Sequence, residues 1–146
     1  MENAEVEAWY ADRSDLKGRY RVMERLGGTG PNCVIGESVY EQSDDFSKPL
    51  LTKYQFSPYL FEAFMHVINF YLAMRDDNEK RILIPFGIDE LQCFRKISNG
   101  EKILVQARKE SGDEKGVKWD ALGIDQNGMV VMYAKGVTMR WISKMR

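Results

Sequence analysis

Histidine and cysteine are scarce in this sequence. Its 146 residues include one histidine, His66, and two cysteines, Cys33 and Cys93, which lie far apart. A structural zinc site needs four closely spaced ligands, so this set predicts no metal site. Since the sequence also lacks a secretory signature, we expect both cysteines to be reduced, buried side chains of a cytoplasmic protein.

Long hydrophobic runs are missing as well. The longest one extends from about residue 57 to residue 72 and contains Glu62 and His66. A membrane-spanning helix needs about 20 apolar residues and rarely tolerates two such groups. Residues 1–18 are acidic and lack the apolar core of a signal peptide. We therefore expect no membrane span.

Neither sign of charge dominates. The net charge is −1, and charged residues make up 29% of the chain. This balance excludes the strongly basic surface by which proteins bind nucleic acids or anionic membranes. Apolar residues are abundant at 44%, which is enough for the core of one domain of this length. We expect residues 1–146 to form a single domain, with 1–18 as a helical extension or linker.

One long helix is predicted at about 59–75. Pro58 stands at its start, where the missing N–H costs nothing, and Ser57 can cap the first turn. A second, short helix is predicted within the N-terminal extension, at about 3–12. The long segment is the more informative of the two, because it is also the most apolar part of the chain.

Strand-like segments flank the long helix. Two precede it, at about 18–28 and 33–41, the second with a bulge at Gly36, and 42–58 reads as a loop. The segments after it are separated by the turn-forming runs SNGE, SGDEKG and DQNG, which are typical of hairpins. These later segments lie at about 81–97 (interrupted near Pro85 and Gly87), 101–110, 116–125 and 128–141.

One long helix cannot cover both faces of a large sheet. A curled antiparallel sheet of about six strands wrapped around one long central helix fits the pattern. We therefore predict an α+β protein with a hotdog fold.

Three polar residues interrupt the long helix. Thirteen of the sixteen residues from 59 to 74 are apolar or aromatic. The exceptions, Glu62, His66 and Asn69, stand at i, i+4 and i+7 and share one face. Two interpretations stay open: a structural hydrogen bond between Glu62 and His66, or an acid–base group. Burial that keeps a glutamate neutral raises its pKa, as catalysis near neutral pH requires.

Three motifs follow one another along the chain. They are the run SPYLFEAFMH at 57–66, the strand IPF at 84–86, and a final strand containing Gly128, Val130, Gly136 and Arg140. From about residue 34 to 142 the chain resembles the C-terminal hotdog half of polyketide synthase dehydratase domains. Those domains carry His-Pro-x-Leu-Leu-Asp-Ala-x-x-Gln/His on the central helix. The helix is also similar to that of fatty-acid 3-hydroxyacyl-thioester dehydratases, which have a glutamate at this place.

The resemblance implies roles for four side chains, and the polar face of the helix adds Asn69. Glu62 takes the place of the helix carboxylate that protonates the departing 3-hydroxyl, and His66 takes the place of the residue that orients it. Asn69, on the same stripe, is expected to face the substrate. Tyr59 and Phe86 are expected to line the acyl channel.

One part of the family pattern is absent. In the dehydratases the general base is a histidine in a His-x-x-x-Gly-x-x-x-x-Pro motif on the other hotdog, and this sequence has no such motif. The base would therefore come from a partner hotdog, or His66 itself would be the base. A third interpretation is an inactive relative that binds acyl chains.

The function implied by the resemblance is dehydration of 3-hydroxyacyl thioesters in polyketide or fatty-acid synthesis. The substrate would be presented on the phosphopantetheine of an acyl carrier protein or on coenzyme A, with no bound cofactor. A homodimer or a pair with another hotdog domain is expected, since unpaired sheet edges invite pairing. Two alternatives remain: a thioesterase in which the helix glutamate activates water, and a non-catalytic acyl-binding or dimerising domain.

Overall fold

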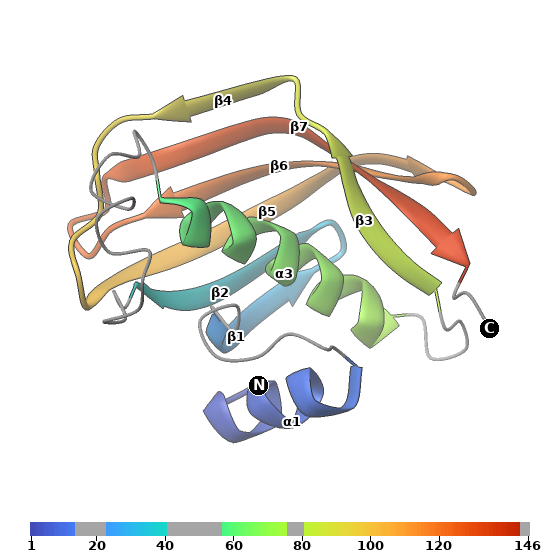
Figure 1. Cartoon of the computed structure of the whole chain (residues 1–146), viewed down its shortest axis with the longest axis horizontal. Helices are drawn as coiled ribbons and strands as arrows, with labels where there is room; N and C mark the ends of the chain where they lie inside the picture. Colours follow the sequence, from blue (N-terminus) through green and yellow to red (C-terminus); the bar gives the residue numbers. More distant parts are fainter. Residues whose placement is uncertain (14–22, 41–56, 76–80, 144–146) are drawn as a thin grey trace, which may run out of the picture.

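The computed structural model describes residues 1–13, 23–40, 57–75 and 81–143, which form one antiparallel sheet and two helices (Figure 1). In chain order the elements are α1 (Asn3–Arg13), β1 (Met23–Gly30), β2 (Cys33–Tyr40), α3 (Pro58–Arg75), β3 (Arg81–Gly87), β4 (Glu90–Cys93), β5 (Glu101–Asp113), β6 (Gly116–Ile124) and β7 (Val130–Ser143).

The sheet has seven strands. Their order is β1-β2-β5-β6-β7-β3, and β4 pairs with β7 beside β3. Strand β7 is long enough to pair with β3 through its C-terminal half and with β4 through residues 132–135. Strands β3 and β4 together therefore form one edge of the sheet, and β1 forms the other.

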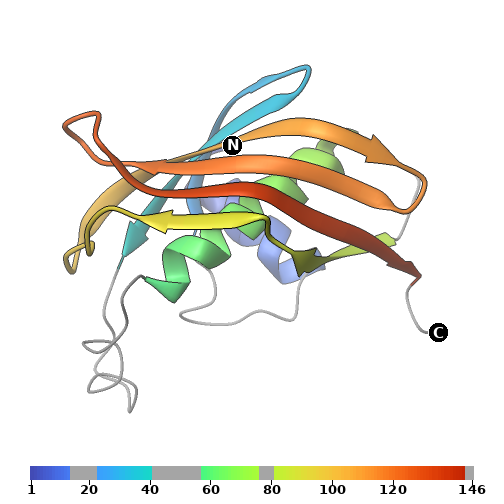
Figure 2. The ribbon, with the colours of Figure 1, turned by 90° about the horizontal axis from the view of Figure 1, so that it is seen from above.

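Helix α3 crosses one face of the curved sheet and packs mainly on β2 and β5, while α1 lies beside β1 (Figures 1 and 2). Aromatic contacts join the two helices, since the rings of Trp9 and Phe70 lie 3.9 Å apart. The described residues form seven strands where about six were expected, and the short helix predicted at about 3–12 is confirmed as α1. Helix α1 adds a second layer beside α3.

Helix α3 begins where its sequence predicts. Pro58 is its first residue, and the Ser57 hydroxyl accepts the N–H of Leu60 at 3.3 Å, as a helix cap does. The side chains from residue 63 to residue 68 are all buried, as expected for a helix that is apolar on nearly every side. This burial fixes the helix against the sheet.

The later strands follow the predicted alternation. Ile103, Val105 and Ala107 of β5 are buried, and so are Trp119 and Ala121 of β6. Their neighbours in sequence point to the outer face, because successive side chains of a strand alternate. The inner face of the sheet and helix α3 thus share one apolar core.

Gly36 is not a bulge. It pairs in regular register with Val105, and the irregularities of this region lie in β1. A Cβ at Gly36 would lie 2.3 Å from Cε of Met23, 3.0 Å from the carbonyl oxygen of Arg25 and 3.3 Å from Cγ2 of Val67. Glycine is therefore needed here because β1 and α3 approach β2 closely.

Two other expectations are corrected and one is confirmed. The SNGE run does not form a hairpin, because β4 pairs with β7 and β5 pairs with β2 and β6. Cys93 is exposed and Cys33 is half-buried, so the prediction that both are buried is wrong. The interruption of segment 81–97 near Pro85 and Gly87 is confirmed, because the pairing of β3 with β7 is irregular between these residues and β3 ends at Gly87. The predicted loop at 42–58 and the start of the first strand lie mostly outside the described residues.

In the part of the chain that the structure describes, neither helix combines the length and the apolar character needed to cross a membrane.

The close approach at Gly36 can be tested by adding a methyl group. We expect Gly36→Ala to lower the free energy of unfolding by about 1–3 kcal/mol, since the Arg25 carbonyl cannot move as easily as the Met23 side chain. Urea denaturation measures this change. The control is Gly28→Ala, because a Cβ at Gly28 meets nothing within 4 Å. Equal stability of the two variants would contradict the packing argument.

Candidate functional site

Glu62 and His66 lie one turn apart on α3 and contact each other. Nε2 of His66 is 3.1 Å from Oε1 of Glu62. The two side chains differ in exposure: 6% of the His66 side chain is accessible and 37% of the Glu62 side chain. The pair therefore has a buried end at the imidazole and a half-open end at the carboxylate, where a ligand can reach it.

The buried end of the pair continues into helix α1. The Tyr10 hydroxyl lies 2.7 Å from Nδ1 of His66, and it accepts the backbone N–H of Met23 at 3.3 Å. The rings of Tyr10 and His66 meet edge to face, with centroids 5.5 Å apart. A hydrogen-bonded chain thus runs from β1 through Tyr10 and His66 to Glu62.

The pKa of Glu62 is lowered from its ordinary value, chiefly because His66 hydrogen bonds to the carboxylate. Partial burial acts in the opposite direction and is outweighed. The raised pKa expected for a fully buried, neutral glutamate is therefore not found. In this structure Glu62 is half-exposed and ionised at neutral pH, which suits a group that accepts a proton.

The other predicted site residues are more dispersed. Tyr59 and Asn69 are half-buried on α3, at the first turn of the helix and one turn beyond His66. Phe86 lies apart from them. Its side chain is 62% exposed, and the Arg140 guanidinium sits 3.8 Å from its ring centroid.

Phe86 is also on the far side of the sheet. Arg140 follows the buried Met139 in β7, so strand alternation places Arg140 on the outer face. Because Phe86 stacks under Arg140, it lies on the face that α3 does not cover. Its part in an acyl channel stays a prediction.

Tyr10 lies within the short helix predicted at about 3–12, and the sequence did not single it out as a site residue. Val6 and Tyr10 are both fully buried and stand at i and i+4 on α1, which marks the inward face of that helix. This spacing signals that Tyr10 is buried. Its partner on α3 is 56 positions away in the sequence, so only the fold shows the contact.

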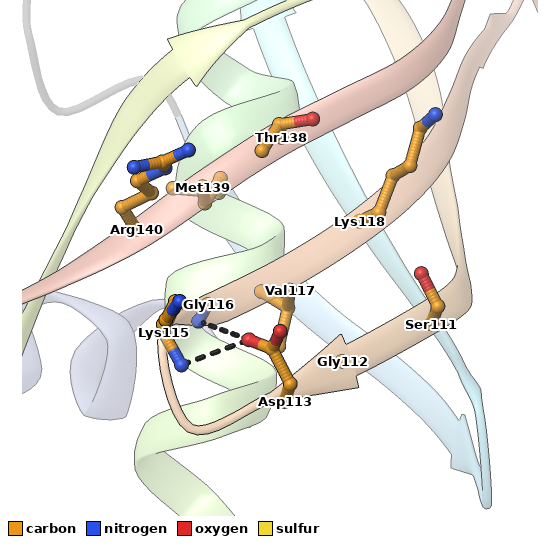
Figure 3. Close-up of a pocket in the computed structure, with 10 residues that line it drawn as sticks. All are labelled: Ser111, Gly112, Asp113, Lys115, Gly116, Val117, Lys118, Thr138, Met139 and Arg140. Atoms are coloured by element: carbon orange, nitrogen blue, oxygen red, sulfur yellow. Dashed lines mark hydrogen bonds between the residues drawn. The ribbon is translucent and has the colours of Figure 1, made fainter.

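A depression of about 290 Å³ lies elsewhere, at the β5–β6 turn and the adjoining part of β7, with α3 behind the strands (Figure 3). Within it the Asp113 carboxylate accepts the backbone N–H groups of Lys115 and Gly116 (Figure 3). These bonds stabilise the turn. Among the described residues, no group of three or more histidine, cysteine, aspartate and glutamate side chains is placed to hold a metal ion.

The family model described as the polyketide synthase dehydratase N-terminal domain matches residues 2–146. The chain therefore belongs to the polyketide synthase dehydratase family. No protein of curated function matches it in sequence. The name of this family model refers to the N-terminal domain, whereas the helix motif at 57–66 resembles the C-terminal half. The family model and the motif therefore agree on the family and differ on which half of the dehydratase the chain represents.

Solved structures share the fold. The dehydratase domain from the CurJ module of curacin polyketide synthase has a TM-score of 0.75 at 20% identity, over 98% of this chain and 50% of that chain. The dehydratase domain of RzxB from Pseudomonas fluorescens has a TM-score of 0.71 at 19% identity, over 92% of this chain and 48% of that chain. The dehydratase heterocomplex ApeI:P from Xenorhabdus doucetiae has a TM-score of 0.69 at 12% identity, over 88% of both chains.

These likenesses show that the chain has a hotdog fold, with seven described strands and two described helices. The chain spans about half the length of the CurJ and RzxB domains.

The bond between His66 and Glu62 predicts a pH dependence of stability. Because the pKa of Glu62 is lowered by folding, its ionised form stabilises the fold above the ordinary glutamate pKa of ~4.3. This contribution is lost as the pH falls through the lowered value. We expect Glu62→Gln to reduce the free energy of unfolding near neutral pH by less than about 1 kcal/mol, since a partly exposed pair is screened.

Urea denaturation over a pH series measures that difference, which should disappear at strongly acidic pH. Glu114→Gln is the control, because it removes the same charge from the exposed β5–β6 turn. A difference between the wild type and Glu62→Gln that grows as the pH falls would mean that folding raises the pKa of Glu62.

Proposed function

We propose that this chain is one hotdog of a dehydratase unit that acts on 3-hydroxyacyl thioesters, with Glu62 as its acid. The observation that carries the proposal is the Glu62–His66 pair on α3, which presents a half-open carboxylate on a buried, hydrogen-bonded support. Family membership supports this reaction class. The helix motif favours the half that supplies the carboxylate, which is the C-terminal half in the dehydratases.

The proposed reaction is an elimination. A base removes the proton from C2 of the acyl chain, the C2–C3 double bond forms, and the C3–O bond breaks. Protonated Glu62 transfers its proton to the departing hydroxyl, which leaves as water. The enoyl thioester is the product, and the base and Glu62 exchange protons with solvent before the next turnover.

Glu62 must be protonated for this step. In the isolated chain the half-open carboxylate is in contact with water. A partner domain and an acyl chain that cover it would remove that water and raise its pKa, because desolvation disfavours the charged form. The acid form would thus arise in the assembled, substrate-bound unit.

His66 is proposed to orient Glu62 rather than to act as the base. Both of its ring nitrogens lie within hydrogen-bonding distance of partners, Nδ1 of Tyr10 and Nε2 of Glu62. The side chain is also almost completely buried. An imidazole held in this way has no nitrogen free to reach the C2 proton, so we assign the base to a partner hotdog.

The partner is proposed to join at the β3–β4 edge. Helix α1 lies beside β1, at the opposite edge of the sheet. The β3–β4 edge carries exposed apolar side chains, including Ile84 and Phe86. An unpaired edge of this kind favours strand pairing. The coverage of only half of the CurJ domain supports a second hotdog, and ApeI:P is itself described as a heterocomplex.

The substrate is proposed to arrive on the phosphopantetheine of an acyl carrier protein, or as a coenzyme A thioester. Backbone N–H groups in the first turn of α3 can polarise the thioester carbonyl, since helix N-termini favour negative charge. Tyr59 in this turn and Asn69 further along α3 would then contact the acyl chain. We assign the protein to the cytoplasm, where such thioesters are made.

A thioesterase is the second candidate, because the lowered pKa of Glu62 favours a proton acceptor. In that reaction ionised Glu62 would activate water for attack on the thioester carbonyl, with no need for a second base. The products distinguish the candidates: an enoyl thioester from dehydration, and a free acid and thiol from hydrolysis. A non-catalytic acyl-binding domain would give neither product.

Substitutions of the pair test the proposed roles in the assembled unit. We expect Glu62→Gln to lower turnover of 3-hydroxyacyl thioesters about 10²–10⁴-fold, because the amide keeps the shape and cannot transfer the proton. His66→Gln should retain turnover within about 10-fold of the wild type, since glutamine can also donate a hydrogen bond to Glu62. Turnover is followed by formation of the enoyl product.

The outcomes separate the hypotheses. Loss of turnover in His66→Gln, with the fold intact, would make His66 the base. Release of free acid by the wild type would favour the thioesterase. Wild-type protein that converts none of the 3-hydroxyacyl, enoyl and saturated thioesters, even with a partner, would leave the non-catalytic interpretation.

Assembly can be measured separately by light scattering at tens of micromolar. We expect a dimer or a hetero-pair, and we expect Ile84→Asp to weaken it, because a charge at an edge opposes strand pairing. Leu104→Asp is the control. Leu104 is 42% exposed and Ile84 is 39% exposed, but Leu104 lies in β5, which is paired with a strand on each side. A monomeric wild type that binds no other hotdog would contradict the pairing.

A further inference from the structure

The hydrogen-bonded chain that ends at Glu62 has a definite direction. An ionised carboxylate can only accept hydrogen bonds, so Nε2 of His66 must carry the proton that lies between it and Glu62. A neutral imidazole has one N–H only. Nδ1 is then an acceptor, and the Tyr10 hydroxyl, 2.7 Å away, is the donor that it meets.

The environment of Tyr10 agrees with this direction. The backbone N–H of Met23 can only donate, and it bonds to the Tyr10 oxygen. Accepting this bond is compatible with donation of the hydroxyl hydrogen to Nδ1. The opposite tautomer, with the proton on Nδ1, would place the bare Nε2 against the Glu62 carboxylate, where two acceptors would face each other in a largely buried site.

We infer that Tyr10 is a positioning residue that holds His66 in the Nε2–H tautomer and so directs an N–H group at Glu62. The tautomer is inferred from the two distances together with an ionised Glu62 and a neutral imidazole, whereas its value for catalysis rests on the proposed function. Tyr10 contacts neither the substrate nor Glu62 directly and acts through His66. Helix α1, which contributes Tyr10, is therefore part of the site.

Several contacts hold α1 in the position that this role requires. The terminal amino group of Met1 donates to the carbonyl oxygen of Leu26 at 2.9 Å. Arg25 of β1 pairs with Glu2 at 2.8 Å. The Tyr10 ring is fully buried and lies 5.5 Å from the ring of Phe70 on α3. The hydroxyl thus has little freedom to move away from His66.

The single histidine makes the tautomer directly measurable. Long-range ¹H–¹⁵N NMR of the wild-type chain, labelled with ¹⁵N, yields one imidazole spin system at mildly alkaline pH, where an ordinary histidine is neutral. We expect a protonated Nε2 and a bare Nδ1. A spectrum with the proton on Nδ1, or with both tautomers equally populated, would overturn the inference without any variant.

Tyr10→Phe removes the hydroxyl and keeps the ring. We expect the His66 signals to shift toward a mixture of tautomers, because Nδ1 loses its donor. Tyr71→Phe is the matched control: Tyr71 is also buried, and its hydroxyl bonds to the carbonyl oxygen of Pro31, away from His66. The control should keep the wild-type tautomer. An unchanged tautomer in folded Tyr10→Phe would overturn the inference, as would an equal change in Tyr71→Phe.

Activity of the assembled unit gives the functional readout. We expect Tyr10→Phe to lower kcat about 10-fold, within the range found for outer partners of functional histidines, and to leave KM nearly unchanged. A higher KM with an unchanged kcat would oppose a positioning role.

The two proposals can fail separately. If no thioester is converted while the wild-type tautomer is Nε2–H and changes in Tyr10→Phe, the proposed function fails and the tautomer assignment stands. If the wild type is active and Tyr10→Phe retains both its kcat and its tautomer, Tyr10 has no positioning role.

Discussion

Helix α3 has to be covered on nearly every side, and the remaining elements are arranged to do this. Its residues from 63 to 68 are all buried, and the sheet alone reaches only one side of the helix. The sheet curves over that side, and α1 packs its aromatic side chains against another. Even the glycine at position 36 follows from this constraint, because the helix and β1 leave no room for a methyl group on β2.

The burial of α3 also decides the chemistry of its polar face, which carries Glu62, His66 and Asn69. A buried imidazole must find partners for its nitrogens, since an unsatisfied polar group in the core is costly. Tyr10 and Glu62 meet this need at opposite ends of the ring. The result is a carboxylate that is held by the buried imidazole on one side and accessible to solvent on the other.

The proposed function places half of the catalytic arrangement on a second hotdog. The half-open carboxylate, the apolar edge formed by β3 and β4, and the coverage of only half of the CurJ domain all favour a second hotdog. In the proposed function the chain supplies the acid, and its histidine holds that acid in place. The proposed division of acid and base between two domains would account for a sequence with one histidine in a dehydratase family.

The sequence by itself determined the helix with its cap, the alternation of β5 and β6, and the pairing of Glu62 with His66, because all of these depend on neighbours within a few residues. The family followed from motifs at 57–66 and 84–86. The sequence could not predict contacts between distant segments. Tyr10 contacts His66, β4 pairs with β7 rather than β5, and Phe86 lies on the outer face of the sheet. The pKa of Glu62 is lowered chiefly by its hydrogen bond to His66, a contact within one helical turn. Tertiary structure decided only that burial, which acts in the opposite direction, is partial.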